Sequence, residues 1–120
     1  MGNPLELSLV NLTPHSLTIH NGDSVLTLPP SGEVARVASN SALVNSFVTI
    51  ENGKPITVNV YDTTYGDVTG LPPYRPSDNV VYVVSGMVNA AVPNRHDVCS
   101  PGELIRDEAG RPIGCRGLRR

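Results

Sequence analysis

Arginine dominates the C-terminal end of this chain. The stretch LIRDEAGRPIGCRGLRR, residues 104–120, holds five of the nine basic residues of the protein, and all five are arginines. A guanidinium group can donate two parallel hydrogen bonds to a phosphate or a carboxylate. The row of arginines therefore indicates either an anion-binding site or a solvated strand edge whose charges oppose aggregation.

The same stretch predicts a β-hairpin that would position these arginines. Residues 108–110 (Glu-Ala-Gly) suit a three-residue turn in which Gly110 takes the left-handed conformation. Such a turn places Asp107 opposite Arg111, where the two side chains can form an ion pair across the strands.

The register of this hairpin assigns the arginines to faces. The apolar residues of the core-facing side are Ile105, Ile113 and Cys115. The other side carries Arg106 and Arg116, close enough for both to clamp one phosphate. The last two arginines, Arg119 and Arg120, are expected to fray because chain ends are seldom held.

The loop before the hairpin carries a second group of candidate residues. PNRHDV, residues 93–98, places Asn94, Arg95 and Asp97 close together. Asn and Asp side chains can read a base edge or ribose hydroxyls, and Arg95 would balance the charge. The same residue types are equally common in turns, where they make local hydrogen bonds, so the sequence leaves both interpretations open.

Few aromatic rings could stack on a base. The chain has four tyrosines, one phenylalanine and no tryptophan. Tyr65 and Tyr74 lie in the predicted loop YGDVTGLPPYRPSD, residues 65–78, and are the better candidates for stacking. Tyr82 lies in an apolar run that is typical of a core strand.

The sequence contains no recognisable metal or catalytic motif. Three histidines and two cysteines lack the spacing of metal ligands, and no nucleophile motif is present. Cys99 and Cys115 are expected to be reduced thiols. We therefore expect no metal, no cofactor and no enzymatic activity.

Charge and hydropathy exclude two classes of partner. Residues 1–94 hold three basic and seven acidic residues, whereas residues 95–120 hold six arginines and four acidic residues. A formal net charge of −2 argues against general binding of duplex nucleic acid. The sequence shows no secretory signal and no apolar stretch of the roughly 20 residues that span a bilayer, so we expect a soluble protein with no membrane partner.

Alternating apolar and polar residues predict a single, mainly β (α+β) domain over residues 1–120. Asn21-Gly22 and Asn52-Gly53 each lie between two such runs, which is a strong hairpin pattern. The expected elements are an N-terminal antiparallel sheet of hairpins over residues 5–84, a short helix over 85–92, a loop over 94–102 and a C-terminal β-hairpin over 103–117.

Several blocks of the chain resemble small phage proteins. They are VNLTPHSLTIHNG, LPPSGEVARVAS, YGDVTGLPP, VVYVVSGMVNAAVPNRHDV and LIRDEAGRPIGCRGL. Together with the layout of most of the chain, they resemble the phage "sponge" proteins that counter the Thoeris and CBASS defences. This resemblance implies sequestration, without catalysis, of a cyclic nucleotide or ADP-ribose-type immune signal in the host bacterial cytoplasm. It also implies a homo-oligomer, a dimer or larger, with pockets at the subunit interfaces.

The resemblance also implies roles for particular residues. The phosphate contacts would fall on Arg106 and Arg116, with Arg111 as a third candidate. The ribose and base would be held by Asn94 and Asp97 and by the ring of Tyr65 or Tyr82.

Two other classes of function remain open from the sequence. A structural phage protein, such as a capsid decoration protein or an adaptor, would also suit many short strands and a modest charge. A small hydrolase of the same nucleotides is a third possibility, because carboxylates far apart in a sequence can meet in a fold.

Overall fold

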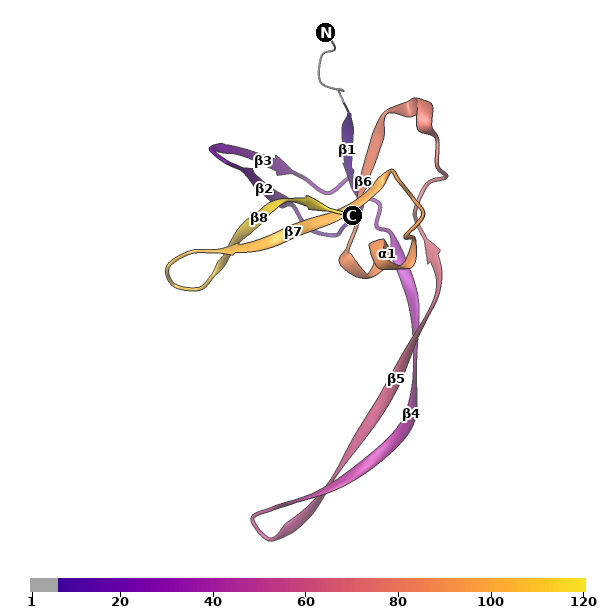
Figure 1. The fold of residues 1–120 in the computed structure, drawn as a ribbon, viewed down its shortest axis with the longest axis vertical. Helices are drawn as coiled ribbons and strands as arrows, with labels where there is room; N and C mark the ends of the chain where they lie inside the picture. Colours follow the sequence, from indigo (N-terminus) through magenta and orange to yellow (C-terminus); the bar gives the residue numbers. More distant parts are fainter. Residues whose placement is uncertain (1–6) are drawn as a thin grey trace. The chain divides into compact units, whose positions relative to one another are not determined.

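The computed structural model describes residues 7–120 (Figure 1). Within this range the protein is mainly β with one short α-helix, as the sequence predicts. The chain divides into two compact units. The first unit combines the residues up to Arg36 with residues 68–120, and the second unit is residues 37–67.

A six-stranded sheet, in the order β1-β6-β7-β8-β2-β3, forms the first unit. Its strands are β1 (Ser8–Asn11), β2 (Leu17–Asn21), β3 (Ser24–Leu28), β6 (Val80–Val83), β7 (Val98–Arg106) and β8 (Pro112–Arg119). The pairs β2–β3 and β7–β8 are antiparallel hairpins, whereas β1–β6, β6–β7 and β2–β8 run parallel. Parallel strands cannot be joined by a tight turn, so these three pairs bring together segments that are distant in the sequence.

The core of the first unit is aliphatic. Its buried apolar residues are Leu12, Ile19, Ala35, Val83, Val84, Val88, Val98 and Cys115. Strand β6 contributes to it most directly, because Val83 is fully buried and the adjacent Val84 leads into the helix. A strand with parallel neighbours on both sides is expected to be this apolar.

A buried asparagine connects β1 to the rest of this unit. The side-chain amide of Asn11 donates to the carbonyl oxygens of His15 (2.8 Å) and Leu28 (3.0 Å). Its Oδ1 accepts from the backbone N–H and the hydroxyl of Thr13, at 2.9 and 2.7 Å. The amide is therefore fully paired, which a polar group needs when it is buried.

The α-helix of the described residues, α1 (Gly86–Ala91), begins three residues after the end of β6. Ser85 caps it, because the Ser85 side chain accepts a hydrogen bond from the Val88 backbone N–H. Val88 is the buried residue of the helix, and Pro93 cannot continue it. The predicted helix over residues 85–92 is confirmed. A 3-10 turn, η1 (Pro76–Asp78), precedes β6.

The second unit is a long two-stranded antiparallel ribbon (Figure 1). It holds most of β4 (Arg36–Glu51) and β5 (Lys54–Thr69), each of 16 residues, whose ends at Arg36 and residues 68–69 belong to the first unit. Asn52 and Gly53 connect the strands and have φ angles of 52° and 77°. Two positive φ angles are the signature of the type I′ turn, so the predicted hairpin at Asn52-Gly53 is confirmed. The hairpin predicted around Asn21-Gly22 is also present, as β2 and β3.

The structure corrects the expected boundaries in three places. The antiparallel sheet predicted over residues 5–84, whose first two residues lie outside the described range, is divided between the six-stranded sheet and the β4–β5 ribbon. The loop predicted over 65–78 begins only after Thr69, because β5 continues to that residue. The loop predicted over 94–102 ends at Val98, because β7 starts there and pairs with β8 beyond the predicted hairpin of 103–117. Each difference arises from strand pairing that local residue types do not reveal.

Candidate functional site

A β-bulge interrupts the C-terminal hairpin. Arg106 lies opposite Pro112, but Ile105 lies opposite Gly114, so Ile113 is an extra residue in β8. An extra residue in one strand shifts the register by one. The prediction that Ile105, Ile113 and Cys115 share the core-facing side is therefore wrong, because Cys115 lies opposite Leu104 and thus on the other face from Ile105.

The bulge also separates the two arginines that were expected to share a face. Arg116 lies opposite Glu103, and the next pair along the hairpin is Leu104 with Cys115. Arg106 follows Leu104 by two residues, so it lies on the same face of β7 as Leu104 and on the opposite face from Glu103. Residues directly opposite each other share a face, and a shift of one residue exchanges the two faces. Arg106 and Arg116 thus lie on opposite faces of the hairpin, and the predicted phosphate clamp between them is not formed.

Two arginines of the hairpin are engaged at its turn. Gly110 has a φ of 81°, as the predicted three-residue turn requires, and the backbone of Asp107 donates to the Arg111 carbonyl. The predicted ion pair between Asp107 and Arg111 is confirmed, with 3.6 Å between Oδ2 and Nε. The Arg106 guanidinium donates to the Gly110 carbonyl at 2.8 Å. Both arginines therefore help to close the turn, and such exposed pairs contribute little to stability.

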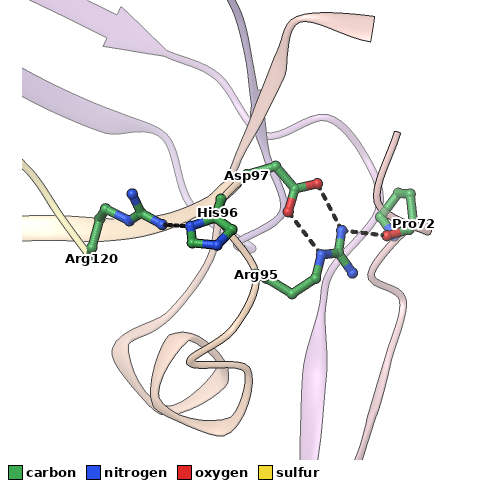
Figure 2. A network of polar contacts seen from close by, with 5 residues as sticks. All are labelled: Pro72, Arg95, His96, Asp97 and Arg120. Atoms are coloured by element: carbon green, nitrogen blue, oxygen red, sulfur yellow. Dashed lines mark hydrogen bonds and ion pairs between the residues drawn. The ribbon is translucent and has the colours of Figure 1, made fainter. Parts of the chain in front are cut away.

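The last two arginines are held rather than frayed, contrary to expectation. Arg119 is the final residue of β8 and lies opposite Ser100 of β7. The side-chain amide of Asn89, on α1, donates to the Ser100 hydroxyl at 3.0 Å and to the Arg119 carbonyl at 3.4 Å. The Arg120 guanidinium lies 2.8 Å from Nδ1 of His96 (Figure 2). Because a guanidinium group only donates hydrogen bonds, His96 must accept at that nitrogen.

Arg95 and Asp97 form a bidentate ion pair before β7 (Figure 2). Nε and Nη2 of Arg95 each donate to one carboxylate oxygen of Asp97 at 2.8 Å. Nη2 also donates to the Pro72 carbonyl at 2.8 Å, and the guanidinium lies 5.9 Å from the centre of the Tyr74 ring. The pair thus connects the segment before β7 to the loop that carries Pro72 and Tyr74.

The electrostatics of this pair keep both groups ionised. The hydrogen bond from Arg95 lowers the pKa of Asp97 below its ordinary value, although burial acts in the opposite direction. The same bond raises the pKa of Arg95. Asp97 is only 8% exposed, and both of its oxygens accept from Arg95. This arrangement favours a structural use of Asp97 over the predicted contact with a ribose.

A pocket of about 470 Å³ lies beside these groups, between α1, the segment before β7 and the end of β8. Its lining residues are Gly86, Asn89, Ala90, Pro93, Arg95, Val98, Ser100, Arg119 and Arg120. Three of them are arginines, and the described residues of the lining include no acidic side chain. The volume is within the range of small-molecule sites, about 300 to 1,000 Å³. Asn89 and Ser100 add an amide and a hydroxyl to the cationic wall.

The remaining predicted site residues lie elsewhere. Asn94 is exposed in the turn after α1, Tyr82 is half-buried in β6, and neither lines the pocket. Tyr65 is exposed in β5 and belongs to the second unit. Tyr74, by contrast, is in the first unit and lines a smaller pocket of about 170 Å³ with His96 and Asp97.

Sequence reasoning found Arg95 but missed Arg119, Arg120, Asn89 and Ser100. No local pattern indicates them, because the apolar residues of GCRGLR (residues 114–119), Cys115 and Leu118, lie three apart rather than in alternation. The position of Arg119 follows only from the pairing of β7 with β8 beyond the predicted hairpin.

The structure adds two observations on other kinds of site. Among residues 7–120, no group of three or more His, Cys, Asp and Glu side chains could hold a metal ion, and no helix in that range is long and apolar enough to cross a membrane. Cys99 and Cys115 are free thiols. Burial raises the pKa of Cys99, which disfavours the reactive thiolate.

The chain matches no known family profile, no curated protein and no solved structure. The chemistry of the arginine-lined pocket and the resemblance noted in the sequence therefore remain as the indications of function.

Proposed function

We propose that the protein binds a small phosphate-bearing molecule of nucleotide size in the arginine-lined pocket and holds it without chemical change. The observation that supports this proposal is the convergence of Arg95, Arg119 and Arg120 on one pocket of about 470 Å³. A phosphate that leaves water needs compensating positive charge and hydrogen bonds, and guanidinium groups supply both.

The three arginines would act differently. Arg95 is already oriented by Asp97 and Pro72, and its Nη1 has no partner among the described residues. It would thus contribute a preorganised donor, which costs little entropy on binding. Arg119 and Arg120 are exposed, and their side chains would close on the phosphate as it enters.

The resemblance to phage sponge proteins supports a narrower ligand class. A cyclic nucleotide or an ADP-ribose derivative would present phosphates to the arginines and neutral hydroxyls or a base to Asn89 and Ser100. The function would then be sequestration of a host immune signal in the bacterial cytoplasm. The ring of Tyr74 lies beside the Arg95 guanidinium. Among the aromatic residues of the first unit, Tyr74 is therefore the best placed to contact a bound base.

Thermal melting tests this proposal. The purified protein is melted with cyclic dinucleotides, cyclic ADP-ribose variants and inorganic pyrophosphate, and any bound ligand is recovered and analysed. A ligand at 100 times its dissociation constant adds about 2.7 kcal/mol, which gives a measurable rise in Tm. We expect an intact ligand to be recovered, and we expect Arg119→Ala or Arg120→Ala to remove most of the shift.

Arg106→Ala and Arg116→Ala are the matched controls. Both remove an arginine from the same hairpin, but neither residue lines the pocket. If these controls abolished binding while Arg120→Ala retained it, the pocket assignment would be wrong. A flat response to every phosphate-bearing compound would contradict the proposed function itself.

A structural phage protein is the second candidate, and the β4–β5 ribbon favours it. Long ribbons with exposed apolar side chains such as Phe47 and Ile50 suit assembly into larger particles. Stoichiometric recovery of the protein with purified virions, together with a flat melting panel, would support this role over ligand sequestration.

A further inference from the structure

The contact between Arg120 and His96 depends on the protonation state of the imidazole ring. Nη2 of Arg120 lies 2.8 Å from Nδ1 of His96 (Figure 2). A guanidinium group has only donors, and a protonated imidazole ring also has only donors. The contact is therefore a hydrogen bond only while His96 is neutral and carries its proton on Nε2.

The charged and titratable groups around His96 come from three parts of the chain: the segment before β7, the end of β8 and the loop before β6. They are Asp97, Arg120, Tyr74 and Arg75. Both oxygens of Asp97 already accept from Arg95, and the ion pairs of the described residues include none to His96. A positive charge on His96 would thus have no carboxylate of its own in this part of the protein.

Protonation of His96 replaces this attractive contact by a repulsive one. The ring then carries a positive charge, and Nδ1 becomes an N–H group that faces a second cation at 2.8 Å. Like charges at this distance repel each other, so the Arg120 side chain must move away from the ring. Histidine is the residue type whose charge ordinarily changes between about pH 5 and 8, so pH is the variable that tests this exchange.

The exchange bears on the arginine-lined pocket, because Arg120 lines that pocket and His96 does not. While His96 is neutral, one N–H group of Arg120 is engaged outside the pocket. Once His96 is protonated, that N–H group is free to donate to an anion, and the anion has one more positive charge close by. Both changes favour an anion in the pocket.

We propose that His96 makes anion binding in the arginine-lined pocket depend on pH, with capture in mildly acidic solution and release as the pH rises. This inference rests on the proposed function, since it concerns the same pocket. His96 is a positioning residue, because it acts on the anion through Arg120. Binding of the anion and of the proton strengthen each other, since such coupling between two sites is reciprocal.

Sulfate binding to the full chain at pH 5.5 and pH 8 tests this inference, because the charge of sulfate does not change between them. Binding is followed by NMR from the backbone amide shifts of Ser100 and Arg119, which line the pocket, at constant ionic strength. We expect the dissociation constant to be about five-fold lower at pH 5.5, the effect of two opposite charges a few ångströms apart at a solvated surface. Equal or weaker binding at pH 5.5 would overturn this inference alone. The absence of sulfate binding at both values would overturn the proposed function together with it.

Two substitutions fix the charge at position 96, and a third is the matched control. His96→Gln is neutral at both pH values and keeps an acceptor for Arg120, so sulfate should bind it equally weakly at both. His96→Arg is positive at both and should bind sulfate with the higher affinity throughout. His15→Gln removes another exposed histidine that lies outside the pocket, and it should keep the pH dependence of the unmodified protein. The inference is overturned if His96→Gln retains that dependence or if His15→Gln loses it.

Discussion

Arg95 and Asp97 show why residue types alone did not identify the site. The cluster in PNRHDV suited either ligand recognition or local structure, and the structure uses Arg95 and Asp97 first for each other and for Pro72. A buried carboxylate is stable only when hydrogen-bond donors reach its oxygens. Arg95 supplies two such donors, Nε and Nη2. The same contact holds Arg95 at the edge of the pocket, so stability and the candidate site depend on one ion pair.

Removal of Arg95 should destabilise the fold. Arg95→Ala leaves the Asp97 carboxylate buried without its donors, and we expect the free energy of unfolding to fall by about 2 kcal/mol. Urea denaturation measures this change. The double variant Arg95→Ala/Asp97→Ala is the matched control and should be less destabilised than the single variant. Equal stability of Arg95→Ala and the unmodified protein would contradict the structural role of the pair.

The same pair predicts a dependence of stability on pH. The pKa of Asp97 is lower in the folded state than its ordinary value of 3.8. Its stabilising contribution is therefore fully present only well above the ordinary pKa and is lost as the pH falls through the lower, folded-state pKa. Urea denaturation between pH 7 and pH 2.5 should show this decrease, and Asp97→Asn should show less of it. An identical acid limb in both proteins would exclude Asp97 as a contributor.

At the scale of elements, the β7–β8 hairpin is shaped by one inserted residue and one close approach. The bulge at Ile113 moves Arg116 to the face opposite Arg106. Further along, a Cβ atom on Gly102 would collide with the carbonyl oxygens of Arg116 and Gly117. The part of the hairpin that carries Arg119 to the pocket therefore depends on glycine at this position.

Substitution of Gly102 should thus weaken the hairpin. Gly102→Ala forces the backbones of β7 and β8 apart, and we expect a loss of about 1 to 3 kcal/mol in the free energy of unfolding. Gly86→Ala is the control, because a Cβ atom there meets nothing within 4 Å, and alanine is a better helix former than glycine. It should be neutral or slightly stabilising. If Gly102→Ala melted at the same temperature as the unmodified protein, the close approach would not matter energetically.

At the scale of the whole molecule, the buried core and the exposed apolar ribbon belong to different units. The buried apolar residues that the structure describes all belong to the first unit. The second unit contributes exposed apolar side chains on a ribbon. The first unit thus holds both the folded core and the pocket.

Shortening the ribbon should leave the first unit intact. Replacement of residues 41–64 by Asn-Gly keeps the antiparallel geometry of the remaining strand ends, because this dipeptide closes a two-residue turn. We expect the shortened chain to retain the melting transition and the ligand shift of the first unit. A shortened chain that fails to fold would show that the first unit depends on the ribbon.

The sequence by itself determined the features that depend on neighbouring residues. Asn52-Gly53 and the turn ending at Gly110 define hairpins because their positive φ angles set the geometry of the turn, and Ser85 and Pro93 bound the helix. The mainly β class follows from the same local patterns. Within the candidate site, only Arg95 could be identified at this level.

Only the tertiary structure decided which distant segments meet. The parallel pairs β1–β6, β6–β7 and β2–β8 join segments separated along the chain. The bulge at Ile113 and the pairing of Arg119 with Ser100 then determine which arginines converge. The physical reason is that strand register depends on the packing of both strands against the whole core. A shift of one residue, invisible in local composition, exchanges the faces of every side chain that follows.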